Sequence, residues 1–218
     1  KDERNLLIDE LSAMGSIECR TDAFGNVLIR LEGKEFVKTD SANEIKLYTD
    51  PVTGFYTPYW SHLARTDKDG NVLTQTKADG TVDPIGLEGA RLFNMKQTIS
   101  TESNTDIGAL KSMLFARGDK RATFKDLDPK TYNKEISQSV MMNMQAEFDQ
   151  LVHQITTEVN RVFYEAALAA KTENPDSNYL CDASGKPYLI FDTNTNTHRG
   201  SYDAADYDEG AYTVENIL

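Results

Sequence analysis

The sequence predicts an α+β protein: an elongated helical rod domain, in which one very long helix packs with shorter helices, joined to an antiparallel β meander or hairpin module. Three observations lead to this class. Residues 129–171 have no internal proline or glycine, and apolar residues recur there every three or four positions. Residues 16–48 alternate apolar and polar side chains between turn signals. Two shorter stretches, 1–14 and 107–117, also have helical spacing.

The long segment begins with favourable helix-start chemistry, because Asp128 can cap the first turn and Pro129 fits within it. We expect an unbroken helix over residues 132–170, about 60 Å long for the whole segment at about 1.5 Å per residue. Its apolar stripe is the predicted packing and assembly seam, which should lie against a partner helix. The seam residues are Met144, Phe148, Leu151, Ile155, Val159, Val162 and Ala166.

The chain divides into four predicted segments. Residues 1–15 are the end of an N-terminal rod helix, stopped by Gly15. Residues 16–104 are a β-rich module, residues 105–171 a helical rod of one short and one long helix, and residues 172–218 a β and loop segment with which an outer domain could begin. Expected strands, in chain order, lie within residues 17–20, 27–31, 35–38, 45–48, 54–61, 70–76 and 188–191. The first four should form one antiparallel meander.

Composition excludes several classes of partner. The chain has 23 basic and 35 acidic residues, a net charge of −12, which repels nucleic acid and anionic membrane surfaces. No run of about 18 apolar residues is present, so we predict no membrane span. The chain begins without methionine and ends inside an apparent element, so we expect it to be part of a longer protein. Cys19 and Cys181 fit no metal pattern and are interpreted as free buried thiols.

Candidate sites for chemistry are few. Asp67, Asp69 and Asn71 alternate around Gly70 as in calcium loops, but later ligands of such a loop are missing in register, which favours a plain hairpin turn. A carboxylate cluster in the C-terminal segment could act in general acid–base catalysis in a hydrolase. We interpret it instead as a solvated acidic loop. That cluster is Asp203, Asp206, Asp208 and Glu209.

Two features of the long helix have a structural interpretation. His153 has no visible catalytic partner and is assigned to the flank of the seam. The methionines Met141, Met142 and Met144 are adaptable apolar surface, suited to a core or seam. With no nucleotide, zinc-protease or nucleophile-elbow motif, the sequence predicts no enzyme and no cofactor.

An aromatic cluster in the β-rich module leaves an alternative function open. Phe55, Tyr56, Tyr59 and Trp60 could pack a thin β module, or they could form a platform that recognises glycan or protein at a cell surface. The alternative to a structural protein is therefore an extracellular binding module.

Three stretches together resemble the flagellar hook-associated proteins of the hook–filament junction, the FlgK family. In that family a helix ending in R-D-x-L-x-x-E-L-S runs into a small β segment, and here Asp2 to Ser12 precedes the Gly25-Asn26-Val27 hairpin. The next matching elements are Gly108-x-Leu110-x-x-x-Leu114-x-x-Arg117-x-Asp119, then Val159-Asn160 in the long helix, then Asp182-x-x-Gly185-x-Pro187 with Phe191. Their order and spacing are similar over nearly the whole chain. The sequence departs from the family at Phe163, often histidine there, at Ala166 or Ala167, often glycine, and in a longer 50–83 segment.

The resemblance implies a non-catalytic structural subunit of the bacterial flagellum that connects hook to filament in motility. Such proteins are secreted through the flagellar type III export apparatus and act outside the cell. The implied partners are the hook protein, the second junction protein and further copies of the chain in a ring. The export chaperone and the terminal coiled-coil helices would belong to regions absent here. A related axial protein, such as the second junction protein or flagellin, is the neighbouring possibility within the same class.

Overall fold

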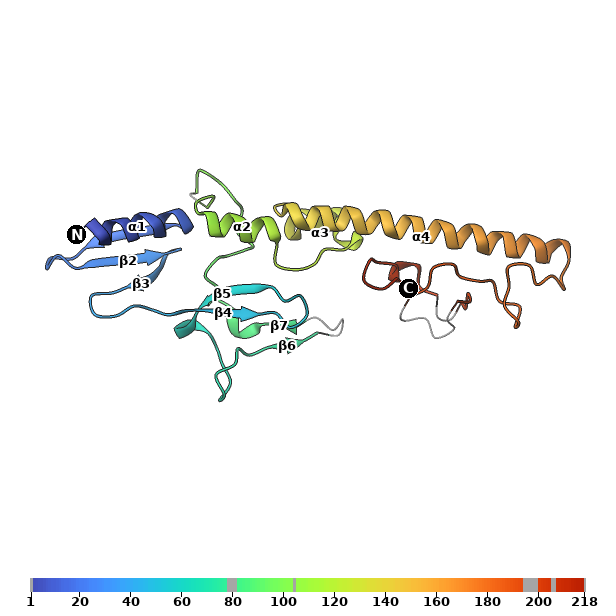
Figure 1. Ribbon diagram of the computed structural model, residues 1–218, viewed down its shortest axis with the longest axis horizontal. Helices are drawn as coiled ribbons and strands as arrows, with labels where there is room; N and C mark the ends of the chain where they lie inside the picture. Colours follow the sequence, from blue (N-terminus) through green and yellow to red (C-terminus); the bar gives the residue numbers. More distant parts are fainter. Residues whose placement is uncertain (1, 78–81, 104, 194–199, 205–206, 218) are drawn as a thin grey trace. The chain divides into compact units, whose positions relative to one another are not determined.

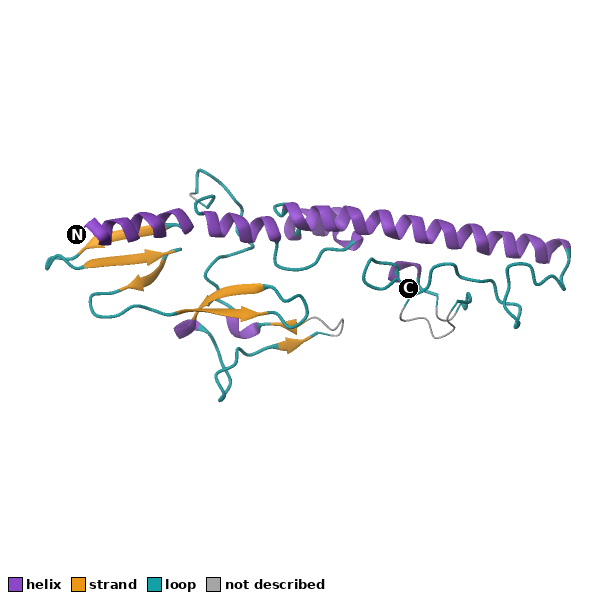
Figure 2. Ribbon diagram, viewed as in Figure 1, coloured by secondary structure: helices purple, strands orange, loops and turns teal. Residues whose placement is uncertain are grey.

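The computed structural model describes residues 2–77, 82–103, 105–193, 200–204, 207–217 of the chain (Figure 1). Its mixed α+β class confirms that part of the prediction (Figure 2). The α-helices among these residues are α1 Asp2–Met14, α2 Ala109–Arg117, α3 Pro129–Glu135 and α4 Val140–Glu173. The strands among them are β1 Ile17–Thr21, β2 Val27–Leu31, β3 Lys34–Val37, β4 Ile45–Thr49, β5 Tyr56–Trp60, β6 Gln75–Thr76 and β7 Val82–Asp83. In this part of the chain, no helix is both long and apolar enough to span a bilayer.

The chain folds as two compact units, each described here by itself. Unit 1 contains residues 1–121 and 137–142, so it holds α1, all the strands and α2. Unit 2 contains residues 122–136 and 143–218, so it holds α3 and most of α4. These boundaries do not follow the four segments expected from the sequence, because α1 and α2 share a unit with the β-rich module.

The first sheet of unit 1 is the predicted meander in three strands. β1, β2 and β3 pair antiparallel in that order, with Ile17 opposite Leu31 and Thr21 opposite Val27. The expected fourth strand was wrong in its pairing, since β4 forms a separate two-stranded sheet with β5. That pairing places Ile45 opposite Trp60, whose side chain is completely buried. Burial of a large aromatic side chain favours this partner over a fourth meander position.

The core of unit 1 forms where the two sheets meet the segment after β7. Leu31, Trp60, Leu92 and Phe93 are its buried centre. Partly buried apolar side chains pack around them. They come from α1, β1, β3, β4, the segment after β7 and α2, and are Leu11, Ile17, Phe36, Ile45, Met95 and Leu114. Contacts distant in sequence therefore unite α1, the strands and α2, which is why they fold as one unit.

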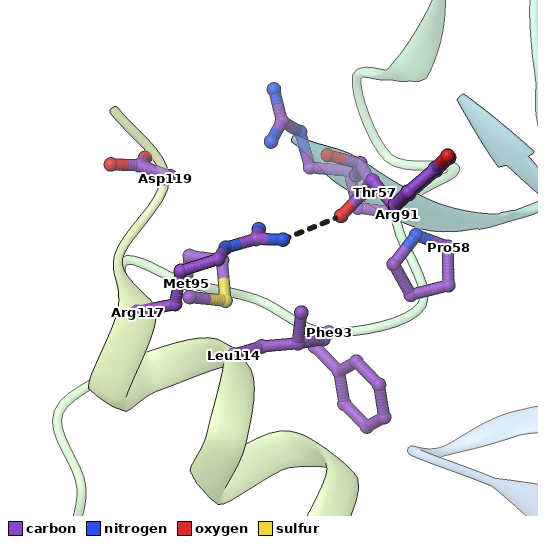
Figure 3. A pocket seen from close by; sticks show the side chains of 9 residues that line it. Thr57, Pro58, Arg91, Phe93, Met95, Leu114, Arg117 and Asp119 are labelled. Atoms are coloured by element: carbon purple, nitrogen blue, oxygen red, sulfur yellow. Dashed lines mark hydrogen bonds between the residues drawn. The ribbon is translucent and has the colours of Figure 1, made fainter. Parts of the chain in front are cut away.

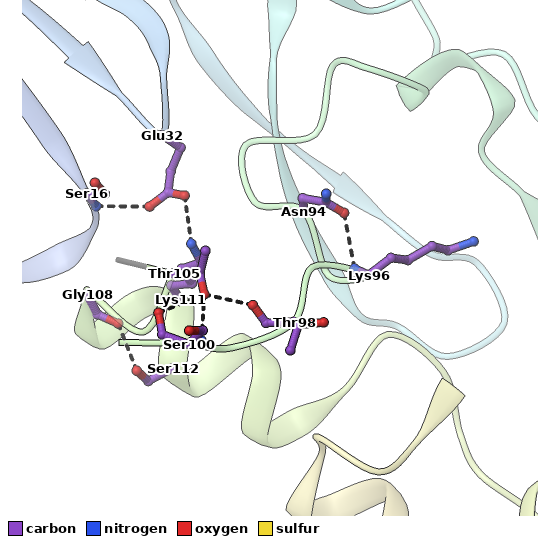
Figure 4. A network of polar contacts seen from close by, with 10 residues as sticks. All are labelled: Ser16, Glu32, Asn94, Lys96, Thr98, Ser100, Thr105, Gly108, Lys111 and Ser112. Carbon is purple, nitrogen blue, oxygen red and sulfur yellow. Dashed lines mark hydrogen bonds and ion pairs between the residues drawn. The ribbon is translucent and has the colours of Figure 1, made fainter. Parts of the chain in front are cut away.

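A polar network holds the end of α1, the β2–β3 turn and the start of α2 together (Figure 4). Lys111 of α2 places its Nζ 2.9 Å from Oε2 of Glu32, and the other carboxylate oxygen accepts from the Ser16 amide at 2.9 Å. Glu32 has a φ of 48°, in the left-handed region that glycine usually occupies. Buried charges of this kind are tolerated when they are paired and hydrogen-bonded, as they are here.

The prediction of one unbroken helix over residues 132–170 was wrong. The chain leaves helical geometry after α3 and re-enters it at α4, so residues 136–139 separate the two helices. Ser139 explains the new start, because its Oγ accepts from the Met142 amide at 3.2 Å and donates to the Ala116 carbonyl at 3.0 Å. A serine that caps a helix in this way must itself be non-helical. α4 alone still has 34 residues.

In unit 2 a largely irregular segment runs along α4 (Figure 1). It comprises residues 174–193, 200–204 and 207–217. The strand expected at residues 188–191 was wrong: among the described residues this region has only isolated bridges, such as Tyr188 with Ser201. Of the two cysteines expected to be buried, Cys181 is buried but Cys19 is exposed on β1, at the edge of the first sheet.

Candidate functional site: one face of helix α4

One face of α4 is buried by residues of its own chain, and polar side chains lie along it. The buried positions of α4 follow a helical spacing and are Met142, Ala146, Asp149, Thr156, Asn160 and Ala167. The irregular segment has no sheet ladder to satisfy its backbone, so side chains of α4 must supply partners. The face therefore works as a row of hydrogen-bonding anchors rather than as an apolar seam.

Asp149 is the first anchor. Its Oδ2 accepts from the Phe124 amide at 2.8 Å, and its Oδ1 accepts from the Val214 amide at 2.7 Å. One turn later His153 stacks on the Phe124 ring, with centroids 3.9 Å apart, and its Nδ1 lies 3.0 Å from the Tyr212 carbonyl. His153, which was expected on the flank of the seam, therefore lies on the opposite face of α4, which packs against other residues of the chain.

Asn160 is the central anchor and is 1% exposed. Its Oδ1 accepts from the amides of Ile190 and Phe191 at 2.9 and 3.0 Å. Its Nδ2 donates to the Phe191 carbonyl at 2.8 Å and to the Tyr212 hydroxyl at 2.9 Å. Burial raises the pKa of Tyr212 above its usual value, and its hydroxyl donates to the Phe191 carbonyl at 3.1 Å.

The other face of α4 carries the predicted seam, and it is exposed to solvent. Met144, Phe148, Leu151, Ile155 and Val162 are between 50 and 60% exposed, whereas Val159 and Ala166 are half-buried. At about 100° per residue, this stripe lies roughly 140° around the helix axis from the anchor face. A row of large apolar side chains left in water along one helix face is typical of an interaction surface.

The methionine run divides between these environments. Met142 is buried and packs against Gly118 in unit 1, whereas Met141 and Met144 are exposed. The sequence pattern correctly marked apolar surface here but could not separate core from outer face.

The aromatic cluster does not form an exposed platform of four rings. Tyr59 and Trp60 are buried, and Phe55 lies under the Arg117 guanidinium at 4.5 Å from its ring centroid. Tyr56 remains exposed. Phe55, Tyr59 and Trp60 therefore pack the β-rich part of unit 1.

The Asp67 carboxylate is occupied by its own turn. Oδ1 accepts from the amides of Asp69 and Asn71 at 2.9 and 2.8 Å, which is a turn and not an open ligand set. Asp22 and Asp182 hold their turns in the same way. The D-x-x-G pattern is a signal for this turn in the sequence, but it also occurs at Asp83 to Gly86, where a short 3-10 helix, Ile85–Leu87, forms instead.

The C-terminal carboxylates bind separate partners. Asp203 pairs with Lys186, and Asp208 accepts from the Gly210 amide at 3.0 Å as the cap of a short 3-10 turn, Glu209–Ala211. Asp206 lies outside the described residues. Nearby, the rings of Tyr164, Tyr202 and Tyr207 form a cluster of tilted contacts, with successive centroids 4.5 and 4.8 Å apart. Tyrosines separated this widely in sequence gave no signal of the cluster.

Comparison with known proteins finds no family, no curated protein and no solved structure that matches this chain.

Proposed function

We propose that this chain is a structural subunit of the bacterial flagellum, of the hook-associated class that connects hook to filament, and that it performs no catalysis. The observation that carries the proposal is the exposed stripe of α4, Met144 to Val162, on a face opposite the anchors that hold the chain's own C-terminal segment. The order of motifs that resembles the junction proteins supports the same class.

The stripe supports assembly on energetic grounds. Complete burial of a fully exposed large apolar side chain stabilises an assembly by about 1.5–3 kcal/mol. The side chains of the stripe are still half exposed or more, so much of this free energy is available to a partner. A partner helix laid along α4 would remove this surface from water. In the proposed assembly α4 is a rod that packs laterally, and the contacts between copies are head-to-tail and close into a ring.

The proposed partners are the hook protein, the second junction protein and further copies of the chain, outside the cell after type III export. The alternative, a binding module that uses the aromatic cluster, depends on Tyr59 and Trp60. Because both are buried, no observation favours it over the structural subunit.

The test uses the protein in a motile cell that encodes it. Phe148→Glu together with Ile155→Glu places charges on the stripe, and Gln154→Glu, an exposed polar position of the same helix, is the matched control. The double variant should be exported but fail to join the flagellum, with loss of swimming in soft agar, while the control swims normally.

Normal motility with the double variant present in isolated flagella would contradict the proposal. The isolated 218-residue chain provides a second test, since it should sediment as a monomer. A closed dimer that protects Phe148 and Ile155 from solvent would contradict the proposed head-to-tail ring.

A further inference from the structure

A pocket in unit 2 lies between α4 and the irregular segment, and the proposed function does not use it. It has a volume of about 190 Å³, and the central anchor Asn160 forms part of its wall. Pockets that take whole drug-sized ligands have volumes of about 300–1,000 Å³. This pocket is therefore sized for a single small chemical group.

One wall of the pocket is aromatic. Tyr164 comes from α4, and Tyr202 and Tyr207 come from the irregular segment. Their rings contact one another, with successive centroids 4.5 and 4.8 Å apart, and the buried side chain of Leu189 adds apolar surface to the lining. The faces of aromatic rings carry partial negative charge, so rings of this kind attract cations and also accept their alkyl groups.

The charged side chains at the pocket favour a ligand of the same sign. Two carboxylates line it, those of Glu158 and Glu209, whereas Arg161 is the one basic side chain among the described lining residues. The Arg161 guanidinium is shared between two carboxylates, because Nε lies 3.0 Å from Oε2 of Glu158 and Nη1 lies 2.8 Å from Oε1 of Glu165. Three carboxylates therefore accompany one guanidinium, which leaves a net negative charge.

A second base lies close to this region but not in the wall. The Nζ of Lys125 is 4.0 Å from the position that a Cβ would take on Gly210, and it lies 5.8 Å from the centroid of the Phe124 ring. With Lys125 counted, three carboxylates still outnumber two bases. The whole chain, with a net charge of −12, adds to the negative potential.

We propose that this pocket binds an organic ammonium group. The alkyl part of the group packs against the tyrosine rings and Leu189, and Glu158 and Glu209 balance its charge. Such a group occurs in free quaternary ammonium compounds and in the lysine side chains of partner proteins. An anionic group is disfavoured because carboxylates are in the majority at the pocket. The inference does not depend on the flagellar assignment.

A pocket of unit 1 provides an internal control. Phe93 and Leu114 also give this pocket apolar surface, but its charged side chains are two arginines, Arg91 and Arg117, with one carboxylate, Asp119 (Figure 3). Two guanidinium groups repel a cation more strongly than one carboxylate attracts it. An ammonium ligand should therefore leave the amides around this pocket unmoved.

The test is a titration of the 218-residue chain with choline, followed by amide chemical shifts in heteronuclear NMR. The alcohol 3,3-dimethylbutan-1-ol has the shape of choline without its charge and is the matched neutral ligand. We expect choline to shift amides of residues 157–164, 200–204 and 207–209. The neutral alcohol should bind about tenfold more weakly. Sodium chloride at the same concentration serves as the control for ionic strength.

A second titration distinguishes the two sources of the ammonium group. The peptide Ac-Gly-Lys-Gly-NH2 carries a lysine ammonium group, and Ac-Gly-Gln-Gly-NH2 is its neutral counterpart. Tighter binding of the lysine peptide than of choline assigns the pocket to a side chain of a partner protein. Tighter binding of choline assigns it to a free quaternary ammonium compound.

Substitution of one ring tests the aromatic wall. Tyr202→Leu should reduce the affinity for choline by about fivefold or more, whereas Tyr202→Phe, which keeps the ring, should retain most of it. Tyr188→Leu is the control, because Tyr188 is a tyrosine of the same segment that is 44% exposed and lies outside the pocket. Thermal unfolding of each variant verifies the fold.

Substitution of a carboxylate keeps the test available if Tyr202→Leu is unstable. Glu209 is exposed, so Glu209→Gln removes one charge at little risk to the fold. This variant should bind choline several-fold more weakly than Glu173→Gln, a matched change at the exposed end of α4.

The proposal would be overturned if choline and the neutral alcohol bound equally well. It would also be overturned if neither millimolar choline nor the lysine peptide shifted the amides of the pocket. A third contrary result is an affinity for choline in Glu209→Gln and Tyr202→Leu that equals the affinity in their two controls.

Discussion

Lys111 and Glu32 form an ion pair 2.9 Å long in which the two side chains are only 4 and 10% exposed. Removal of one partner leaves the other charge buried and uncompensated, which typically destabilises a protein by about 3–5 kcal/mol. We therefore expect Lys111→Met to lower the free energy of unfolding of unit 1 by about that amount, measured by urea denaturation. Lys46→Met is the control, because Lys46 pairs with Glu44 in an exposed position. The control should change stability by less than about 1 kcal/mol, and equal effects of the two variants would contradict the prediction.

Gly108 should be irreplaceable for a steric reason. It has a φ of 109°, and a Cβ built there would lie 2.5 Å from both the Met14 carbonyl oxygen and the Gly15 Cα. Gly33 also has a positive φ, 76°, but open space around it. Gly33→Ala should therefore destabilise by about 1–2 kcal/mol through the backbone alone. Gly108→Ala should lower the free energy of unfolding by at least about 2 kcal/mol more than Gly33→Ala does, as expected for overpacking. Matching thermal unfolding curves would show that α1 and α2 can separate without loss.

Asn160→Leu should detach the irregular segment from α4. The change keeps a similar volume but leaves the amides of Ile190 and Phe191 without the Asn160 oxygen, at a loss of about 1–3 kcal/mol for each unsatisfied group. Hydrogen exchange at these two amides should accelerate strongly. Gln154→Ala, an exposed change on the same helix, should leave their exchange rates unaltered. Unchanged protection in the Asn160 variant would mean that other contacts hold the segment.

The aspartates of the three D-x-x-G turns predict a loss of stability in acid. The hydroxyl of Ser184, then that of Ser201, and the turn amides hold the pKa of Asp182 well below its usual range. Hydrogen bonds from Asn26 and Asn71 lower the pKa of Asp22 and Asp67. Because each folded pKa lies below the unfolded value of about 3.9, the stabilisation is complete above that pH. It is lost as pH falls through the folded pKa.

A carboxyl-carbon NMR titration checks this expectation directly. Ser184→Ala should move the Asp182 midpoint upward, toward the ordinary value, since it removes the hydroxyl that lies 2.7 Å from Oδ1. The midpoints of Asp22 and Asp67, in distant turns, should remain where they are and serve as internal controls. An unmoved Asp182 midpoint would refute the assigned cause.

Local patterns predicted many of the individual elements, although the unbroken helix over residues 132–170 and the strand at residues 188–191 were wrong. The stop at Gly15, the hairpin turn at Asp22 and the capping of α3 by Asp128, which accepts from the Lys130 amide at 2.8 Å, depend on neighbouring residues alone. The apolar stripe of α4 was equally visible, because helical periodicity requires nothing from the rest of the fold. The pairing of β4 with β5 was not, since it depends on burial of Trp60 by residues far along the chain.

The two faces of α4 were also only partly predictable from the sequence. Residues of the stripe could be listed from spacing, but an apolar stripe on a long helix is normally assigned to the interior. The anchor face escaped notice because its residues are polar, although Asp149, His153, Thr156 and Asn160 repeat at intervals of four, three and four. The helical spacing of these polar residues was the signal that could have revealed the anchor face.

The sequence by itself determined the positions of α1, α2 and the first three strands, the turns at Gly15 and Asp22, and which side chains share a face of α4, because those properties follow from interactions within a few residues. Only the tertiary structure decided that the polar face of α4 is the packed one and that the apolar face remains in water. The physical reason is that an irregular segment must satisfy its backbone amides, and Asp149 and Asn160 offer hydrogen bonds that the apolar stripe lacks.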